Sequence, residues 1–396
     1  MGWGGTGLLP GGASLVRKKR RHRAEARCHE SRYREIWRHR AEARCHGYLV
    51  AVSDATIFIH AALADLAQGR GLSASTSEEI FEYMLRGMLD AGQIGSLLSL
   101  IEAKGATADE LVGAATSMRR HVMPVPLTEV TRARVIDTCG TGGAPKLFNV
   151  STIAALVAAG AGAKVVKHGN RSRTGRGSAE IMQALGVQVE ASPEVQARCV
   201  EHAGLCFCFA IHHHPATRAA APVRKSLGFP TIFNLLGPLT NPGRASRQLL
   251  GVSKAEHVRV VAEALSRLGC TRAMVVHAND GFDELSTTSA NLVAHVEGDS
   301  VRTVTLHPEQ LGISTATREA LQADTLEEAV GIARDVLHGT PGAKTEMVVF
   351  NAGAALYVSG EAEDLREGVE KAREAIESHK ALERLEALRA ASNQGS

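Results

Sequence analysis

Apolar side chains recur every three or four positions between about residue 51 and residue 130, and short polar or glycine-containing turns interrupt the pattern. One run consists of Ile80, Met84, Leu85, Met88 and Leu89, and the next of Ile94, Leu97, Leu98 and Ile101. Such spacing predicts amphipathic helices. Helix starts are expected at Ser77, which precedes two glutamates, and at Thr107, which has Glu110 three positions later. The region is therefore predicted to be all-helical.

The pattern changes after Pro124 and Pro126. Strands are expected at residues 135–136, 164–167, 205–211, 273–277 and 347–350, and helices from residue 151, at 256–268 and at the charged C-terminal end. Strand, loop, helix and strand in succession are typical of a parallel sheet. We therefore predict the α/β class, with a small N-terminal all-helical domain and a larger domain in which helices flank a central, mostly parallel sheet.

Composition agrees with a globular α/β protein. Of the 396 residues, 44% are hydrophobic and 22% charged, which excludes a disordered or fibrous chain. The seven cysteines are an odd number spread over a long chain, so they favour a reducing cytoplasm over a disulfide framework. Neither an export signal nor a bilayer-spanning helix is predicted, and a membrane is not an expected partner.

Cys206 and Cys208 stand just before the three histidines at 212–214. They are candidate metal ligands, but no paired C-x-x-C and no second cluster at ligand spacing accompanies them. Structural cysteines are the favoured interpretation.

The first fifty residues differ from the rest. Residues 17–44 hold twelve lysines and arginines against four glutamates, although the net charge of the chain is only +3. The nine residues 21–29 recur identically as residues 38–46. We expect residues 1–52 to be a disordered, basic extension, encoded either within the gene or upstream of its true start codon. The alternative is an arm that binds nucleic acid, although nucleic acid is not the expected partner.

A glycine-rich turn follows the first strand. Asp137 precedes Gly140, Gly142 and Gly143, and Asn149, Val150, Ser151 and Thr152 lead into the next helix. Glycines let backbone N–H groups approach phosphate oxygens, and a helix N-terminus with hydroxyls completes an anion cradle. The turn matches neither the Walker pattern nor G-x-G-x-x-G, so phosphate binding and a simple tight turn both remain open.

A second motif, Lys167-His168-Gly-Asn170-Arg171, comes directly after a predicted strand. Open α/β sheets bind ligands at this position, and lysine and arginine beside a glycine are suited to phosphate. The alternative is a solvated basic turn. The nearby glycine-rich loop favours the functional interpretation.

Two further motifs are weaker on their own. Adjacent carboxylates at Asp283 and Glu284 suit Mg²⁺, although acidic pairs are common on exposed loops. Arg224 lies on a predicted helix between two Pro/Gly turns, where it can grip a carboxylate or form a structural ion pair.

Taken together, in their order and spacing, the four motifs resemble the anthranilate phosphoribosyltransferases of tryptophan biosynthesis. The resemblance runs from about Leu72 to the C-terminal helices. Residues 87–93, 104–105 and 110–111 resemble the helical domain of that family, and residues 351–356 resemble its last strand and helix. The implied domains are 53–131, joined in space by helices from about 212–240, and the phosphoribosyl-transfer domain 132–396.

The resemblance implies a Mg²⁺-dependent transfer of the phosphoribosyl group of phosphoribosyl pyrophosphate (PRPP) to the amine of anthranilate, by a homodimer paired through its helical domains. The residues it assigns to PRPP are Gly140, Gly143, Asn149, Val150, Ser151, Thr152, Lys167 and Ser178. Those it assigns to anthranilate are Gly140, Asn170, Arg224, Gly237 and Pro238. The metal ligands would be Ser151, Asp283 and Glu284. No catalytic base is assigned, and His168 is a candidate proton acceptor.

The chain departs from the family pattern at two loops. Gly143 is followed by residues 144–147 in place of the usual Asp-Gly, which leaves Lys146 as a candidate contact to pyrophosphate. The loop at residues 172–178 is one residue shorter and more basic than usual.

Two other functions compete. A pyrimidine nucleoside phosphorylase shares the fold, but Asp283 with Glu284 and the segment 234–242 are not expected in a metal-independent phosphorylase. The other rival is a noncatalytic or nucleic-acid-binding relative, which the basic arm and the altered loops favour and the retained Asn170 and Arg224 oppose.

Overall fold

The computed structural model describes Met1 and residues 54–144, 147–172 and 175–394. The repeat in the basic extension and Lys146 lie outside these ranges. The chain divides into two compact units, Met1–Ile57 and Phe58–Ser396, and almost all of the described helices and strands belong to the second unit.

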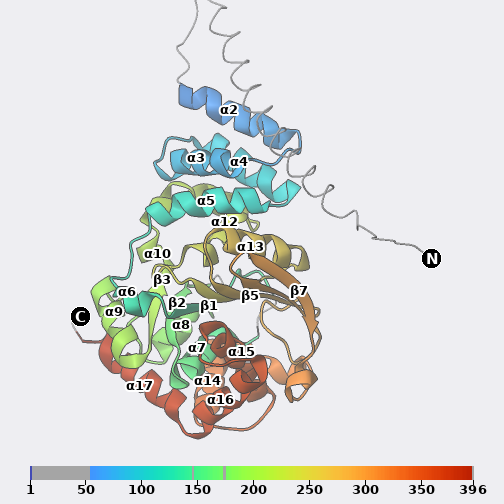
Figure 1. Ribbon diagram of the computed structural model, residues 1–396. Coiled ribbons are helices and arrows are strands. Elements are labelled where there is room, and N and C mark those ends of the chain that lie inside the picture. Colours follow the sequence, from blue (N-terminus) through green and yellow to red (C-terminus); the bar gives the residue numbers. More distant parts are fainter. Residues whose placement is uncertain (2–53, 145–146, 173–174, 395–396) are drawn as a thin grey trace, which may run out of the picture. The chain divides into compact units, whose positions relative to one another are not determined.

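The predicted helices are present near the start of this unit. They are α2 (Asp54–Ala67), α3 (Ala74–Leu85), α4 (Ala91–Lys104) and α5 (Ala108–Arg120), drawn in blue and cyan in Figure 1. Thr107 caps α5 as expected: its hydroxyl accepts from the Glu110 N–H, and the Glu110 carboxylate accepts from the Thr107 N–H. The start predicted at Ser77 is wrong. Helix α3 begins after Ser73, whose hydroxyl caps the Thr76 N–H, and Ser77 is buried inside the helix.

A seven-stranded sheet forms the centre of the larger part. Its strands are β1 (Val135–Gly140), β2 (Lys164–Gly169), β3 (Leu205–Phe209), β4 (Arg247–Gly251), β5 (Arg272–Ala278), β6 (Asn291–Glu297) and β7 (Ser300–Leu306). Their order is β3-β2-β1-β4-β5-β6-β7, in which β1 to β5 are parallel to one another and β6 pairs antiparallel with both β5 and β7. The prediction of a mostly parallel sheet behind a helical N-terminal region is confirmed.

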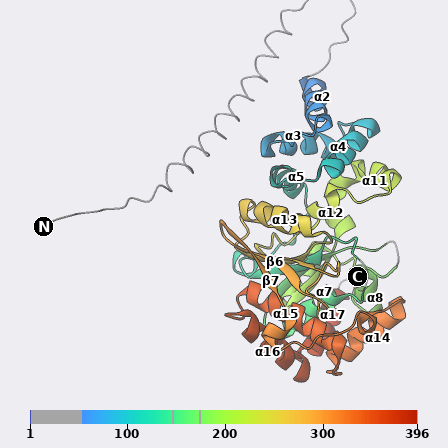
Figure 2. The ribbon, with the colours of Figure 1, turned by 90° about the vertical axis from the view of Figure 1, so that its right-hand side faces the viewer.

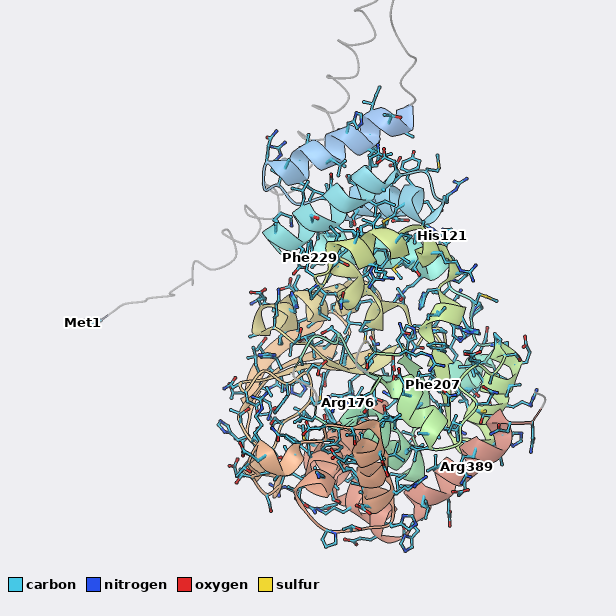
Figure 3. All side chains as sticks on the ribbon, turned by 180° about the vertical axis from the view of Figure 1, so that it is seen from behind. Met1, His121, Arg176, Phe207, Phe229 and Arg389 are labelled. Carbon is cyan, nitrogen blue, oxygen red and sulfur yellow. The ribbon has the colours of Figure 1, made fainter. Side chains whose placement is uncertain are left out.

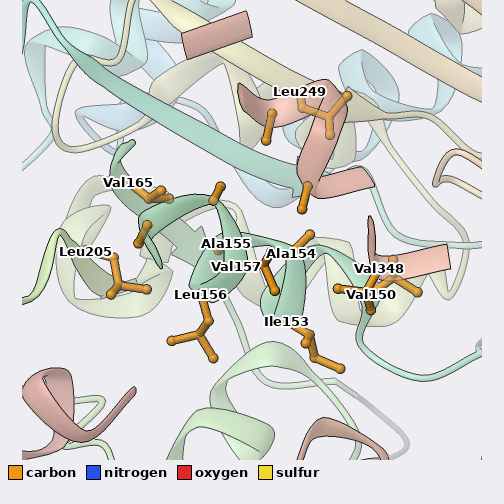
Figure 4. Packing of buried hydrophobic residues seen from close by; sticks show 14 of the residues in the cluster. Val150, Ile153, Ala154, Ala155, Leu156, Val157, Val165, Leu205, Leu249 and Val348 are labelled. Atoms are coloured by element: carbon orange, nitrogen blue, oxygen red, sulfur yellow. The ribbon is translucent and has the colours of Figure 1, made fainter. Parts of the chain in front are cut away.

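Helices cover both faces of the sheet. On one face α13 (Ala255–Arg267) packs against β5 and β6, and on the other α7 (Val150–Gly160) and α15 (Ala343–Ser359) pack against β1 and β4 (Figure 2). Other helices of this part are α8 (Ser178–Ala184), α9 (Pro193–Ala203), α14 (Leu326–Leu337), α16 (Leu365–Glu377) and α17 (Lys380–Ser392). Figure 4 shows how Val150, Ile153 and the alanines of α7 meet Val348 and Leu249 in one apolar cluster. No helix in the described ranges has the length and hydropathy needed to cross a bilayer.

The strand predicted at residues 347–350 is wrong, and so is the strand expected within 351–356. Both segments belong to α15 (Ala343–Ser359). Residues from Met347 to Leu356 are buried all around the helix, so the sequence shows a continuous apolar run instead of a helical period. Periodicity alone cannot separate a fully buried helix from a buried strand.

Short helices follow β3 and lie against the N-terminal helices. They are α10 (Ala210–His213), α11 (Ala221–Leu227) and α12 (Ile232–Leu236), with the 3₁₀ turns η1 (Pro215–Ala219) and η2 (Pro238–Thr240). The Phe81 and Phe233 rings lie 6.0 Å apart, which joins α12 to α3. A Cβ on Gly95 of α4 would lie 3.7 Å from Val223 of α11. Strand β3 therefore ends at Phe209, two residues before the predicted end, because the chain turns toward these helices.

Candidate active site

The C-terminal ends of β1 and β2 and the loop after β5 surround a pocket of about 230 Å³. Parallel sheets bind ligands at this edge. The lining residues that the sequence analysis had singled out are Gly140, Gly142, Gly143, Asn149, Ser151, Thr152, Lys167, His168, Asn170, Ser178, Asp283 and Glu284. Val150 is fully buried behind the pocket at the start of α7.

Glycines bring the loop that holds Asp283 close to β1 and β4. A Cβ on Gly140 would lie 2.6 Å from Asp283 Oδ2, and one on Gly251 would lie 1.6 Å from the Asp283 carbonyl oxygen. The Gly142 N–H donates to Asp283 Oδ2 at 3.2 Å. Only residues without a side chain leave room for the acidic loop at the end of these two strands.

Asp283 and Glu284 meet the start of α7. The Ser151 N–H donates to Glu284 Oε1 at 3.1 Å. Burial, and next the neighbouring Asp283 carboxylate, raise the pKa of Glu284 to about 8. Two carboxylates held together in this way favour a cation between them. Their oxygens and the Ser151 hydroxyl are ligands of the kind that Mg²⁺ prefers.

Lys167 brings a buried cation to the floor of the pocket. Only 1% of the residue is exposed, and its Nζ donates to the Thr138 carbonyl at 2.6 Å and to Ser151 Oγ at 3.3 Å. Burial lowers the pKa of Lys167, while the nearby Asp137 carboxylate opposes this shift. The sequence analysis placed Asp137 in the glycine-rich motif without a role. An acid in the middle of an apolar strand was the available signal, since a buried carboxylate needs a charged partner.

His168 lies between two partners. Its Nδ1 is 3.2 Å from the Gly237 carbonyl oxygen, and its Nε2 is 3.2 Å from His214 Nε2. A carbonyl only accepts, so Nδ1 of His168 carries the proton and His214 Nε2–H donates to the other nitrogen. Burial lowers the pKa of both imidazoles, that of His214 to about 4. Both rings are therefore neutral near pH 7.

Comparison with known proteins agrees with this geometry. Residues 132–382 match the a/b domain of a glycosyl transferase family. Residues 60–122 match the helical bundle domain described for a glycosyl transferase family. The chain is 46% identical over 331 residues to the anthranilate phosphoribosyltransferase of Rubrobacter xylanophilus, covering 83% of this chain and 96% of that protein. This chain belongs to the anthranilate phosphoribosyltransferase family.

Solved members of the family have the same fold. The enzyme of Thermus thermophilus, 39% identical, matches with a TM-score of 0.78 over 84% of this chain and 99% of its own. The Saccharomyces cerevisiae enzyme, in complex with PRPP and Mg, is 25% identical and matches with a TM-score of 0.77 over 86% of this chain and 99% of its own.

The residues expected to bind anthranilate lie apart from one another. Asn170 lines the pocket, and its Oδ1 accepts from the Arg171 N–H at 2.8 Å. Gly237 touches the site only through its carbonyl oxygen, which accepts from His168 Nδ1–H. The Arg224 guanidinium lies over the Phe233 ring, 4.6 Å from its centroid. Pro238 lines a different cavity, and its carbonyl accepts from Gln248 Nε2 at 2.6 Å. Gly140 and Asn170 line the pocket at the end of β1 and β2, whereas Arg224, Gly237 and Pro238 are not among its lining residues.

Arg176 is a lining residue that the sequence analysis did not select. It comes from the short basic loop before α8 and lies at the centre of the view in Figure 3. Its guanidinium donates to the Ala323 carbonyl, and its own carbonyl accepts from Asn149 Nδ2 at 3.2 Å. The excess of arginine in this loop was the signal. It gave no reason to prefer Arg176 over its neighbours.

The candidate cysteine and histidine metal site receives no support from the structure. Within the described residues no group of three or more histidine, cysteine or acidic side chains has metal-binding geometry. The five described cysteines are free and buried, and the Cys206 and Cys208 sulfurs lie 3.8 Å apart in β3. They pack as small apolar side chains, as the sequence analysis favoured.

Proposed function

We propose that this chain transfers the 5-phosphoribosyl group of PRPP to the amine of anthranilate in tryptophan biosynthesis, giving N-(5-phosphoribosyl)anthranilate and pyrophosphate. The observation that carries the proposal is the convergence of Lys167, Asp283 with Glu284, and the start of α7 on one pocket. A cation and an acidic pair that can hold a metal are what a pyrophosphate leaving group requires.

The reaction breaks the bond from ribose C1 to pyrophosphate and forms a bond from C1 to the amine nitrogen, which then loses one proton to solvent or to the departing pyrophosphate. Positive charge develops at C1 while negative charge develops on the leaving oxygen. Lys167 is oriented toward Ser151 by the Thr138 carbonyl, so its charge is fixed in place before the reaction begins. The N–H groups of the glycine turn add donors at the same end of the sheet.

We assign Mg²⁺ to Ser151, Asp283 and Glu284. Support comes from the raised pKa of Glu284, because a divalent cation would relieve the repulsion between the two carboxylates. When bound, the metal would supply positive charge for the pyrophosphate oxygens. Gly140 and Gly251 keep the acidic loop in position for this role.

The aromatic amine of anthranilate is nucleophilic without a strong base. We place its ring near Asn170 and His168, with Arg224 gripping the carboxylate. His168 is neutral because it is buried beside His214, and both of its ring nitrogens already have partners, so its ring is suited to pack against a substrate ring.

The decisive experiment follows the fluorescence of anthranilate mixed with the purified chain, PRPP and Mg²⁺. The signal should fall only when all three are present. Arg224→Ala should raise the KM for anthranilate at least about tenfold and leave the KM for PRPP nearly unchanged, since one charge-assisted pair contributes about 1.5–3 kcal/mol. Lys225→Ala, the exposed neighbour on the same helix, is the matched control. Equal changes in both KM values would reject the role of Arg224.

If no fluorescence is lost although the chain is folded, the noncatalytic alternative takes precedence. To test the noncatalytic alternative, nucleic-acid binding of the full chain is compared with that of a chain lacking residues 1–52. Steeply salt-dependent binding that disappears with the deletion would support it.

We further propose that residues 53–131 and the helices from about 212–240 act as one helical domain, beside a transfer domain of residues 132–396, and that the chain pairs through the former. The contact between Phe81 and Phe233 supports the joining of the two segments. Light scattering of the full chain should give about twice its mass of 41.9 kDa. A monomer mass would reject the dimer without affecting the proposed activity.

A further inference from the structure

A second cavity, of about 360 Å³, lies where the end of α5 meets the end of α13 and the loop before β4. His121, labelled in Figure 3, is the residue that follows α5. Three arginines line the cavity: Arg119, Arg120 and Arg244. Its fourteen lining residues include no acidic side chain. Arg120 pairs with Glu78 and Glu82, so among the described residues the unpaired positive charge of the lining comes from Arg119 and Arg244.

Arg119 holds its charge inside this space without a carboxylate in hydrogen-bond contact among the described residues. Its Nε donates to the Leu239 carbonyl at 2.8 Å and one Nη to the Leu268 carbonyl at 3.0 Å. A guanidinium has five N–H groups, so three remain for another acceptor. Burial lowers the pKa of Arg119, and the nearby charge of Arg244 lowers it further. An anion beside Arg119 would oppose this lowering, because an opposite charge favours the protonated guanidinium.

Arg244 has an unusual backbone conformation. Its φ is +53°, one of only two positive values at non-glycine positions among the described residues. Glycine adopts this conformation without a steric penalty, whereas in other residues it raises the conformational energy by about 1–2 kcal/mol. Its side chain has no hydrogen bond or ion pair within the described ranges. A strained arginine at the mouth of a cavity is typical of a residue that holds a ligand.

The rest of the lining limits the kind of anion. Val122, Leu239, Leu265 and Leu268 form an apolar wall, and Ser246 and Gln248 add polar groups. The volume lies near the lower end of the range for small-molecule sites, about 300–1,000 Å³. Inorganic phosphate would leave the apolar wall in contact with water, while an organic anion with a compact apolar body would cover it.

We propose that this cavity is a second ligand site, distinct from the pocket at β1 and β2, and that it binds a small organic carboxylate with an apolar body. The carboxylate pairs with Arg119 and Arg244, and the apolar body lies against the leucines. Because Arg119 belongs to α5 and Arg244 to the loop before β4, the ligand ties the helical segment to the sheet.

The connection between these two parts runs past the site. The Met123 N–H donates to the His213 carbonyl at 2.9 Å, and the Val125 N–H donates to the Pro242 carbonyl at 3.1 Å. Arg244 is two residues after Pro242. A ligand between Arg119 and Arg244 therefore lies beside the first half of the linker that joins α5 to α6 (Glu129–Arg132).

Calorimetric titration of the full chain with benzoate tests the proposal, and benzyl alcohol serves as the neutral molecule of similar shape. Benzoate should bind and raise the unfolding midpoint, and benzyl alcohol should do neither. Arg244→Gly should weaken benzoate at least about tenfold, since it removes a charge-assisted pair without disturbing a backbone that favours glycine. Arg244→Asn should do the same, because asparagine also tolerates positive φ.

Arg259→Gln is the matched control, since Arg259 is an exposed arginine on α13 that does not line the cavity. It should leave benzoate binding unchanged. The proposal is overturned if benzoate does not bind, if benzyl alcohol binds equally well, or if both Arg244 variants bind benzoate like the unmodified chain. The last outcome would place benzoate elsewhere, for example at Arg224.

Discussion

The buried histidines beside the pocket make the stability of this protein sensitive to acid. His214 is 8% exposed, and burial lowers its pKa to about 4 from the ordinary value of 6.5. In the unfolded chain the same imidazole takes up a proton as the pH falls below about 6.5. The unfolded state then binds more protons than the folded state, so stability is complete above pH 6.5 and falls as the pH decreases toward 4.

The magnitude follows from the two pKa values. Between pH 7 and pH 5, the linkage relation gives a loss of about 2 kcal/mol for a pKa of about 4 in the folded state and 6.5 in the unfolded state. His168, whose pKa is also lowered by burial, acts in the same direction. His214→Gln keeps a side-chain N–H for His168 Nε2 and removes the titration.

Urea denaturation at pH 7 and pH 5 measures this effect. The variant should lose about 2 kcal/mol less than the unmodified chain over this interval. His202→Gln changes an exposed histidine on α9 and should behave like the unmodified chain. If His214→Gln loses as much stability between the two pH values as the unmodified chain does, then His214 is not held neutral by burial and the reasoning fails.

Three further predictions concern the acidic loop and a helix cap. Glu284→Gln should weaken the Mg²⁺ dependence of turnover at least about tenfold, measured as rate against metal concentration; an unchanged curve would remove Glu284 from the metal site. Gly251→Ala should lower the free energy of unfolding by about 1–3 kcal/mol in urea, because its Cβ meets the Asp283 carbonyl, whereas Gly331→Ala, which has open space, should not; equal effects would contradict the packing argument. Thr107→Ala should cost about 1 kcal/mol by the same assay, and no change would mean that the cap is dispensable.

Local signals were enough to predict much of the fold. Thr107 with Glu110 predicted the start of α5 because capping is a matter of a few neighbouring residues. The run at 164–167 predicted β2 because a short apolar segment after a turn favours a strand. The failure at residues 347–350 has the opposite cause, since α15 is buried on every side and its sequence carries no period. The antiparallel pair β6 and β7 was also not predicted.

Part of the site was also predicted from local signals. Glycines, Lys167 and the pair Asp283 with Glu284 were recognisable as residue types that suit phosphate and metal. The roles of Asp137 and Arg176 were not, because neither lies in a pattern that distinguishes a functional residue from its neighbours. Both depend on contacts with segments far away in the chain, such as the Ala323 carbonyl that Arg176 reaches.

The sequence by itself determined the helical and strand-forming segments, the order of the chemical motifs along the chain and the family they belong to. The tertiary structure alone decided which of those motifs share a pocket. Asp283 lies more than a hundred residues from Gly142, and they meet only because β1 and β4 are neighbours in the sheet and Gly140 and Gly251 leave room between them. It also decided that Arg119 and Arg244 line one cavity, since that depends on how α5 packs against α13 and the loop before β4. Local preferences act over a few residues, whereas charge, burial and close approach are set by the packing of distant segments.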